Sequence, residues 1–333
     1  MNYVYIKIGG TWFSPELPKF VMLLYTFLFN MFLLISLMTI IKDLVLIFRT
    51  ILKLFGLFKV SHFTNNQIGI FMLVLAFVIS SYSFYEVIRV PKIIRHDVAI
   101  DDLPKELDGT TVVQLTDLHM SALNTKPFAE GVVQKVNSLD PDMVLITGDF
   151  VDGYLKDRKD ALEPLKDLKT KYGVYGIDGN HEYYSGYKDW LSRLKSYGID
   201  MVENDNRILN INGRQLAIVG VQDDQGHPDV KKATSGLSPN IPKILLCHRP
   251  GHAAHNAKYD IDLQLSGHTH GGMMIGLNKL VIAKHNGGFV SGWYDVNKMK
   301  LYVSNGTSLW NGFPVRIGVP GEITLFTLRS AKK

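Results

Sequence analysis

The stretch TVVQLTDLH at residues 111–119 runs from a short apolar segment directly into an aspartate and a histidine. The same arrangement recurs in MVLITGD at 143–149 and in VYGIDGNH at 174–181. Short apolar runs that end at glycine or polar residues are typical of buried strands. Because the carboxyl ends of neighbouring strands meet at one edge of a sheet, we expect the polar groups that follow these strands to converge there.

The remaining elements of residues 97–333 follow from the same periodicities. Strands are predicted at Thr111–Leu115, Met143–Thr147, Val174–Ile177, Leu216–Val221, Lys243–Cys247 and Leu263–Ser266, with two more near Leu301–Val303 and Glu322–Leu328. Helices are predicted at Phe128–Leu139, Ala161–Thr170 and Tyr187–Tyr197. Alternating strands and helices followed by strands predict an α/β fold, in which sheets pack together with helices outside.

The amino-terminal part has a different composition and predicts a membrane anchor at 1–96, ahead of the α/β domain at 97–333. Phe20–Ile41 is an uncharged run of 22 residues, and Ile68–Tyr85 is an uncharged run of 18. About 20 apolar residues in a helix cross a bilayer's hydrocarbon core, so both runs are predicted to be transmembrane helices, at about 20–41 and 68–85. The alternative is a signal peptide followed by a buried core helix. The first run is too long for a typical signal peptide, and no small-residue cleavage site follows it.

The segment at 42–60 between these runs is apolar with a few basic residues. Lys42, Arg49 and Lys53 follow at spacings of seven and four, which places them on one helix face. This predicts an interfacial amphipathic helix or a tight hairpin whose basic face meets lipid phosphates. Basic loops favour the cytoplasm, so we expect a multi-pass protein of the cell membrane with an extracytoplasmic α/β domain, although Arg89, Lys92 and Arg95 favour the opposite orientation.

The charge distribution argues for lipid rather than nucleic acid as a partner. The net charge is +5, but residues 1–105 hold 10 Lys/Arg against 6 Asp/Glu, which leaves 26 against 25 for the rest. A nucleic-acid-binding domain would carry the basic surplus itself, so no nucleic-acid partner is expected, and anionic lipid headgroups explain the basic segment. The single cysteine, Cys247, excludes an internal disulfide and a thiolate metal cluster.

The polar residues after the strands form a set of metal-ligand type, with oxygen and imidazole donors. Its members are Asp117, His119, Asp149, Asn180, His248, His268 and His270, and His181 is left over for acid catalysis. A metal pair needs a bridging carboxylate, and mixed nitrogen and oxygen ligands suit Mn, Fe or Zn better than Mg or Ca. The sequence therefore predicts a site for two divalent metal ions. Gly148, Gly179 and Gly267 each precede a ligand and are predicted to let the backbone turn sharply.

These blocks (D-x-H, G-D, G-N-H-E, a single H, and G-H-T-H) resemble the calcineurin-like metallophosphoesterase family in residue type and order. The resemblance implies a four-layer αββα sandwich with the site at one sheet edge. It also implies that Asp117, His119 and His270 bind one metal and Asn180, His248 and His268 the other, with Asp149 bridging. By the same resemblance, His181 protonates the leaving oxygen.

The stretch LSGHTHGG at 265–272, together with amino-terminal membrane helices, is similar to a membrane-anchored branch of that family. Met273 departs from the glutamine common in that branch. Arg316 is a candidate for binding a substrate phosphate through its bidentate fork, with a surface ion pair as the alternative. His252 and His255 are predicted to be exposed helix residues or substrate contacts. Two roles are open for the aromatic residues near the motifs: they form walls of the pocket, or they pack in the core. These residues are Tyr183, Tyr184, Trp293 and Trp310.

The function that follows from this resemblance is a membrane-anchored, dinuclear metal-dependent phosphoesterase. It would hydrolyse phosphodiester, phosphomonoester or pyrophosphate bonds, and a lipid-linked substrate such as a UDP-glycolipid is one candidate. The alternative is a non-catalytic membrane scaffold that uses the same fold to bind proteins. Such a scaffold is expected to have lost ligands, whereas every ligand position is filled here.

Overall fold

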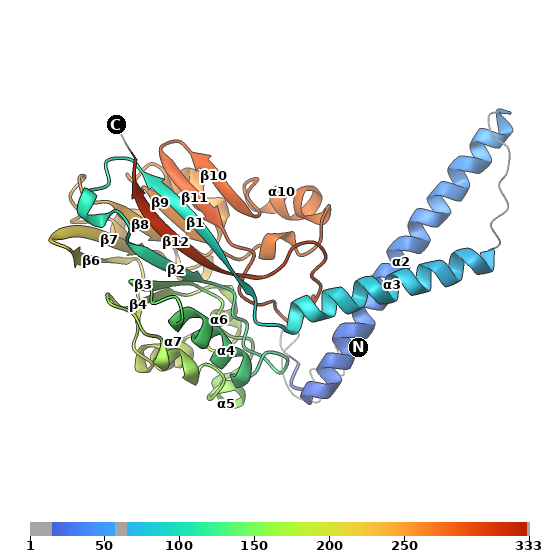
Figure 1. Cartoon of the computed structure of the whole chain (residues 1–333), viewed down its shortest axis with the longest axis horizontal. Helices are drawn as coiled ribbons and strands as arrows, with labels where there is room; N and C mark the ends of the chain where they lie inside the picture. The colour runs from blue at the N-terminus through green and yellow to red at the C-terminus, as the bar shows by residue number, and fades with distance from the viewer. Residues whose placement is uncertain (1–14, 57–64, 332–333) are drawn as a thin grey trace.

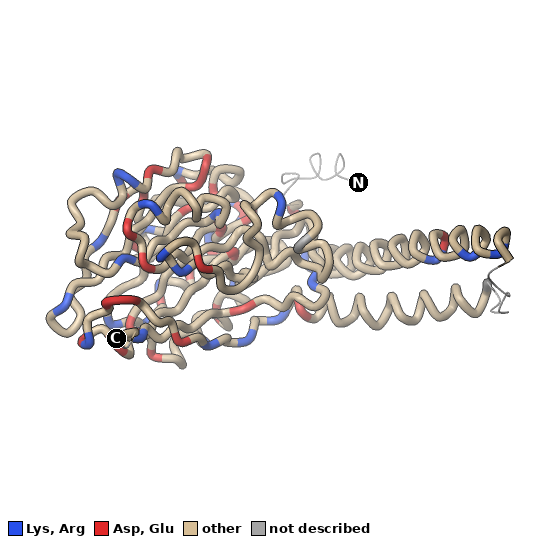
Figure 2. The backbone as a smooth tube through the Cα atoms, turned by 90° about the horizontal axis from the view of Figure 1, so that it is seen from above, with Lys and Arg blue, Asp and Glu red and all other residues tan. Residues whose placement is uncertain are grey.

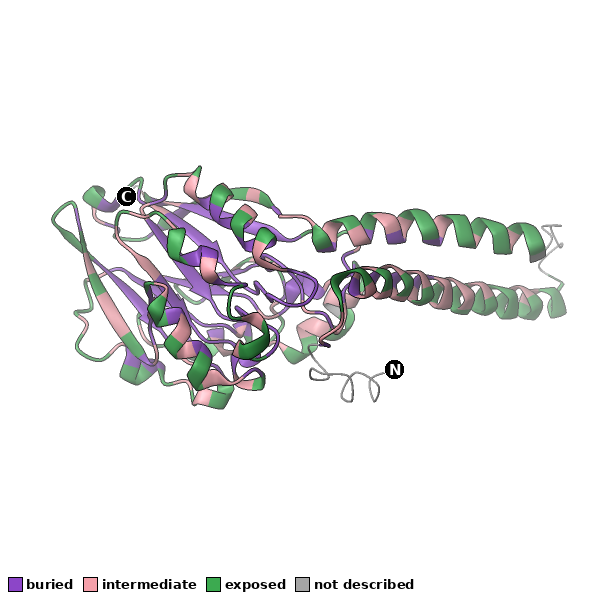
Figure 3. Ribbon diagram, turned by 90° about the horizontal axis from the view of Figure 1, so that it is seen from below, coloured by how far each residue is buried: buried purple, intermediate pink, exposed green. Residues whose placement is uncertain are grey.

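Two long apolar helices project from one side of the α/β domain in the computed structural model, which describes residues 15–56 and 65–331 (Figure 1). Helix α2 spans Lys19–Leu54 and α3 spans Asn65–Ile88, and both are long and apolar enough to cross a membrane. Large apolar side chains lie exposed along them, for example Phe32 at 72% and Phe71 at 65%. Neither helix is therefore the buried core helix of the alternative prediction. Figure 3 shows how little of either helix is buried.

The predicted amphipathic segment at 42–60 is wrong where the structure describes it. Helix α2 continues without a break to Leu54, so Lys42, Arg49 and Lys53 lie on its distal part rather than on a separate element (Figure 2). The physical reason is that residues 42–54 contain no glycine or proline, the residues that end helices. Residues 57–60 of the prediction lie outside the described part of the chain.

The α/β domain contains two six-stranded sheets that pack face to face. The first has the order β1-β12-β2-β3-β4-β5, with bounds Lys92–Ile100, Glu322–Ser330, Thr111–Leu115, Met143–Thr147, Val174–Ile177 and Ile199–Met201. The second has the order β10-β11-β9-β8-β7-β6, with bounds Gly292–Val296, Met299–Val303, Leu263–Ser266, Lys243–Leu246, Arg214–Gly220 and Asp205–Ile211.

Helices cover the outer face of each sheet, which confirms the predicted four-layer α/β sandwich. The first sheet packs against α4 (Lys126–Asn137) and α7 (Tyr187–Ser196), the second against α8 (Val230–Ala233) and α9 (Ala253–Asn256). The short elements between them are α5 (Leu155–Arg158), α6 (Asn180–Tyr184), α10 (Ala283–His285), the 3-10 turns η1 (Lys105–Leu107), η2 (Glu163–Asp167), η3 (Asp224–Gly226), η4 (Pro250–His252) and η5 (His270–Gly272), and the π-helical turn η6 (Asn278–Ile282).

The structure differs from the prediction at strands β1, β5, β6 and β10, none of which is predicted, and at one helix. The first sheet begins with β1 at Lys92, ahead of the predicted division at 96/97, because the whole of β1 pairs in parallel with β12. The helix predicted at Ala161–Thr170 is wrong. This stretch contains only η2, because Leu168 leaves the helical region with φ −62° and ψ 127°.

The two long helices are fastened to the α/β domain by buried polar contacts. Asn30 in the amino-terminal third of α2 is fully buried, and its Nδ2 donates to the Pro314 carbonyl oxygen at 2.8 Å. The Ser83 hydroxyl of α3 donates to Asn30 Oδ1 at 2.5 Å and accepts from the Arg316 backbone N–H at 2.9 Å. A small apolar cluster at the base of the helices includes Met22 and Val87. The stretch 314–317 is therefore bonded to both long helices.

We expect Asn30→Leu to loosen the helix pair from the domain. The substitution keeps the side-chain volume but removes the bonds to Pro314 and Ser83, and buried polar contacts between membrane helices contribute about 0.6–1.7 kcal/mol. The thermal unfolding midpoint of the full chain in detergent should fall. Thr39→Val is the control, because the Thr39 hydroxyl donates to Ile35 within α2. Equal midpoints for the two variants would contradict this account of the attachment.

Candidate metal centre

The residues predicted as ligands all follow strands, and the structure brings them to one edge of the sandwich. Strands β2, β3 and β4 run parallel in the first sheet, and β7, β8 and β9 run parallel in the second. The carboxyl ends of β2, β3, β4, β8 and β9 carry, in that order, Asp117 with His119, Asp149, Asn180 with His181, His248, and His268 with His270. Ligands from both sheets thus converge, as the sequence predicts.

The backbone is strained at these positions. Five of the predicted ligands have left-handed φ angles, which non-glycine residues adopt at a cost of about 1–3 kcal/mol each. They are Asp117 (52°), His119 (41°), Asp149 (54°), His268 (69°) and His270 (50°). Strain of this kind persists only where the surroundings hold the backbone in place, and it clusters at functional sites.

The glycines beside the ligands serve two different purposes. Gly148 has φ 91°, which confirms the predicted sharp turn there. Gly179 has φ −122°, so the predicted turn is wrong at this residue. An added Cβ on Gly179 would lie 2.2 Å from Asp149 Oδ1, and one on Gly267 would lie 2.2 Å from Asp117 Oδ2. These two glycines are required because a carboxylate approaches their backbone closely.

One group of donors consists of Asp117, His119 and His270, which lie close enough together to hold a metal ion. Asp117 Oδ1 is 3.7 Å from His119 Nε2 and 3.5 Å from His270 Nε2. The two ring nitrogens face each other at 3.2 Å. Burial lowers the pKa of His270 to about 3, so the ring is neutral, the form that binds metals.

A second group consists of Asp149, His248 and His268, with Asn180 beside them. His248 Nδ1 donates to the Thr147 carbonyl oxygen at 2.7 Å, which leaves Nε2 facing Asp149 Oδ2 at 3.2 Å. Among the described residues, neither His248 Nε2 nor Asn180 Oδ1 has a hydrogen-bond partner, although both atoms are buried. Buried acceptors without partners are costly, and a cation would satisfy both. The donor set therefore fits a metal ion.

Asp149 lies between the two groups. Its Oδ2 is 3.6 Å from His119 Nε2 of the first group and 3.2 Å from His248 Nε2 of the second. The carboxylate of Glu182 holds this loop, because Oε2 accepts the backbone N–H groups of Asp149 and Gly179 at 3.0 and 2.8 Å. Oε1 also accepts the N–H of Phe150 at 2.8 Å. Glu182 thus fixes the loop that carries Asp149.

Asp152 is a residue of the site that the sequence reasoning missed. Its Oδ1 contacts Nδ1 of His119 at 2.8 Å and Nδ1 of His181 at 2.6 Å. Such contacts set the ring orientation and the tautomer of a histidine. Burial opposes protonation of His119, but Asp152, Asp117 and Asp149 raise its pKa well above the usual value. The sequence signal would have been the second carboxylate of GDFVDG at 148–153.

A pocket of about 260 Å³ opens over the ligands. Its floor includes Asn180, His181 and His270, and its walls include Tyr184, Met273, Ile282 and Trp310. Tyr184 and Trp310 therefore line the pocket, which agrees with the first of the two predicted roles, pocket wall rather than core packing. Tyr183 instead stacks on Tyr187, with ring centroids 4.4 Å apart.

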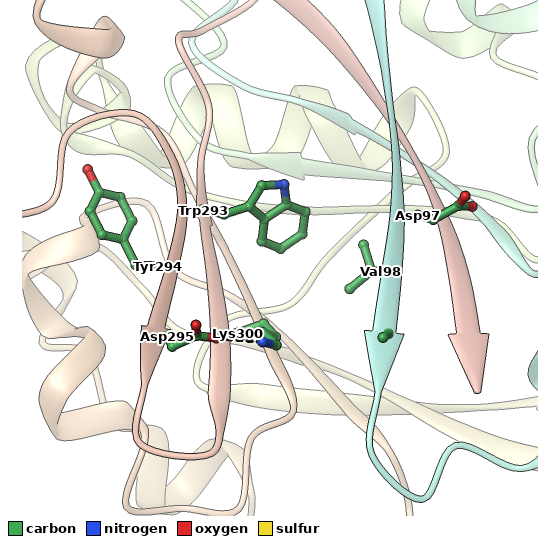
Figure 4. A pocket seen from close by; sticks show the side chains of 7 residues that line it. Asp97, Val98, Trp293, Tyr294, Asp295 and Lys300 are labelled. Carbon is green, nitrogen blue, oxygen red and sulfur yellow. Dashed lines mark hydrogen bonds and ion pairs between the residues drawn. The ribbon is translucent and has the colours of Figure 1, made fainter. Parts of the chain in front are cut away.

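Of two further pockets, one adjoins this site and the other lies away from it. A groove of about 370 Å³ adjoins His268 and is lined by charged and titratable residues that include Asp224, Arg249, His252 and His285. The pocket in Figure 4 lies between β1 and β10 and is lined by Asp97, Trp293 and Lys300, with no member of either metal-ligand group. Trp293 is thus a wall of this other pocket, away from the ligands.

Arg316 is not placed to bind a substrate phosphate. Its side chain is 1% exposed, and its guanidinium donates to the carbonyl oxygens of Asn305, Ser308 and Val319 at 2.9, 2.5 and 3.1 Å. The surface ion pair of the alternative prediction is also wrong. The guanidinium group of Arg316 instead binds backbone carbonyl oxygens of the neighbouring loop. The sequence alone does not reveal these partners.

Comparison with known proteins decides the family. Residues 110–272 match the calcineurin-like phosphoesterase family. An uncharacterized metallophosphoesterase of Campylobacter jejuni is 35% identical over 269 residues, which are 78% of this chain and 69% of that protein. The chain belongs to the calcineurin-like metallophosphoesterases. It is therefore a metal-dependent phosphoric ester hydrolase that uses divalent ions.

Relatives that carry membrane segments are similar to it as well. A transmembrane protein with metallophosphoesterase domain from Danio rerio is 33% identical over 275 residues, 78% of this chain and 62% of that protein. A protein of the same description from Bos taurus is 34% identical over 259 residues, 72% of this chain and 58% of that protein. The match thus spans less than two thirds of these two relatives. Together with α2 and α3, they indicate a membrane-associated metallophosphoesterase.

We expect Arg316→Met to reduce stability rather than substrate affinity. Methionine leaves buried carbonyl oxygens without donors, at about 1–3 kcal/mol each, so the unfolding midpoint in detergent should fall by several degrees. Arg329→Met is the matched control, because Arg329 is half exposed and forms a surface ion pair with Asp97, which contributes about 0–1 kcal/mol. A raised KM with an unchanged midpoint would restore the role in substrate binding.

Proposed function

We propose that this metallophosphoesterase is a dinuclear enzyme anchored to the membrane by two helices. Asp117, His119 and His270 would hold one divalent ion, and Asn180, His248 and His268 the other. The observation that carries the proposal is the position of Asp149, whose Oδ2 lies 3.6 Å from His119 Nε2 and 3.2 Å from His248 Nε2, between donors assigned to different ions. The buried Asn180 Oδ1, which has no hydrogen-bond partner among the described residues, supports it. Mixed imidazole and oxygen donors favour Mn, Fe or Zn.

The bound ions would supply an activated water and positive charge beside the phosphoryl oxygens. The chain itself supplies the proton. His181 lines the pocket, and its Nδ1 is held by Asp152 at 2.6 Å, which leaves Nε2 for the departing oxygen of the ester. His181 also groups with His119 and Asp152, but hydrogen bonds to the shared carboxylate account for this closeness. We therefore assign His181 as the general acid.

The walls around the site suit an amphiphilic phosphate ester. On one side of His268, Met273, Ile282 and Trp310 form an apolar wall. On the other side, the groove with Arg249 offers a guanidinium whose Nη1 already lies 3.2 Å from His268 Nε2. A lipid-linked phosphate or pyrophosphate, for example a UDP-glycolipid, would place its polar part against the groove and its apolar part against the wall. Diesters, monoesters and pyrophosphates all remain within this class.

The charges of α2 support one membrane orientation. Lys42, Arg49 and Lys53 gather toward the end of α2 that is distal to the α/β domain (Figure 2). By the positive-inside tendency this end would face the cytoplasm, and the catalytic domain would be extracytoplasmic. Arg89 lies at the other end, but it pairs with Glu86 at 2.7 Å, which reduces its weight in the balance.

We expect Asp149→Ala to empty the metal site. Loss of the bridging carboxylate removes a ligand from both ions at once, so the metal content measured by plasma mass spectrometry should fall from a pair per chain toward none. Asp295→Ala is the matched control, because Asp295 lies on β10 in an exposed ion pair with Lys300. A full complement of metal in Asp149→Ala would contradict the bridging assignment.

We expect His181→Ala to keep its metals and lose turnover. Removal of a general acid typically lowers the rate by about 10²–10⁴-fold, whereas the ligand groups stay intact. The protein would be loaded with Mn²⁺ in detergent and assayed on p-nitrophenyl phosphate, bis-p-nitrophenyl phosphate and a UDP-glycolipid. The preferred substrate would define the class of ester. Metal-loaded wild-type protein without turnover on any of them would favour the scaffold alternative.

A further inference from the structure

The segment Ile275–His285, here called the docking segment, exposes apolar side chains beside the metal site. Leu280 is 78% exposed, Ile275 69% and Val281 46%. Among the described residues of the α/β domain, Leu280 and Ile275 are the most exposed large apolar side chains. Burial of large apolar side chains favours association, so three of them within seven residues form a surface suited to an apolar partner.

The docking segment lies on the side of the domain that carries the membrane helices. Figure 1 shows α10, which is part of the segment, facing the side from which α2 and α3 extend. The Ile275 N–H donates to the Ile317 carbonyl oxygen at 3.1 Å, and the Ile317 N–H donates to Met273 at 2.9 Å. The neighbouring Arg316 N–H bonds Ser83 of α3. One short stretch of chain, 314–317, thus connects the docking segment with both helices.

The charge of the docking segment fits a lipid surface. Residues 276–285 read GLNKLVIAKH, with two lysines, one histidine and no acidic residue. Lys284 and His285 are exposed in the structure. Apolar side chains flanked by basic ones are typical of segments that enter the bilayer interface, where anionic headgroups attract the cations. A bilayer is therefore the partner whose chemistry matches this surface.

The opposite side of the same segment belongs to the pocket over the metal site. Ile282 follows the exposed Val281 directly and lines that pocket, as do Met273 before the segment and Asn286 after it. We infer that the docking segment inserts its exposed apolar side chains into the surface of the bilayer that α2 and α3 cross, and thereby places the pocket mouth at the lipid headgroups. This inference rests on the proposed membrane anchoring and narrows the substrate class to esters presented by the membrane.

The consequence concerns the route of the substrate. The pocket wall and the membrane contact are adjacent residues of one segment, so a phosphate ester with a lipid tail could enter from the bilayer without passing through water. A wall placed in this way also keeps the apolar part of the substrate beside Trp310, which packs against the apolar cluster at the helix base that includes Met22 of α2. The same geometry gives a fully water-soluble ester no comparable advantage.

Site-directed labelling of the full chain tests the inference. Leu280→Cys would carry an environment-sensitive fluorophore in phosphatidylcholine vesicles that contain phosphatidylglycerol, and quenching by lipid-borne spin labels would be measured. Native Cys247 is buried at 2% exposure, which makes labelling selective. Ile208→Cys is the matched control, because Ile208 is 46% exposed on β6, at the end of the domain opposite to the helices (Figure 1). Phe32→Cys in α2, at 72% exposure, reports whether the helix pair is in contact with lipid.

The expected result is strong quenching at positions 280 and 32 and at least about tenfold weaker quenching at 208. Quenching at 32 with position 280 as unquenched as 208 would overturn the docking segment while the anchor stands. Absence of quenching at 32 would instead overturn the membrane anchoring, and with it this inference. Val281→Cys, labelled in the same way, is the second variant if Leu280→Cys fails to fold, and thermal unfolding of each unlabelled variant in detergent checks the fold.

Discussion

The position of the Asp149 carboxylate is the constraint on which the rest of the site depends. Its Oδ2 must reach ring nitrogens that come from two different sheets, so the ends of β3 and β8 have to lie side by side. The Asp149 carboxylate leaves no room for a Cβ on Gly179, and Asp149 itself has a left-handed conformation. Glu182 offsets part of this strain by accepting the backbone N–H groups of the turn. The packing of the two sheets against each other and the positions of the candidate ligands at their edge therefore depend on each other.

The local sequence pattern is sufficient to predict the strands that consist of a continuous run of buried apolar residues. Strands β2, β3, β4 and β9 match the predicted ranges residue for residue, because each is a buried apolar run that ends in glycine or polar residues. The ligand types and their order identified the family for the same reason. Asp152 and Arg316 were not assigned correctly, because their roles depend on partners far along the chain, His181 for one and Asn305 for the other. Strand β1 was missed because only its last residues are buried, so it shows no apolar run.

The long helices α2 and α3 contribute to the architecture around the candidate site. Asn30 and Ser83 bond the stretch 314–317, and that stretch pairs with Met273 and Ile275 just after the ligand His270. Polar groups buried between apolar helices are costly unless they are hydrogen-bonded. Asn30 therefore favours the single register of α2 against α3 in which its hydrogen bonds form. A shift of α2 against α3 would break that register and disturb the wall of the metal-site pocket. The membrane part and the catalytic part are therefore mechanically connected.

The orientation of the imidazoles is built from contacts within the protein. Thr147 fixes the ring of His248, Asp152 fixes those of His119 and His181, and Arg249 lies at Nε2 of His268, which leaves Nδ1 of that ring for a cation. A cation entering such a site loses little free energy in ordering its ligands, because the neighbouring groups have already ordered them. The unfavourable terms are backbone strain at five ligands and the proximity of two buried carboxylates, Asp117 and Asp149. Under the proposed function, a pair of divalent ions would neutralise these carboxylates directly, which would account for so strained an edge.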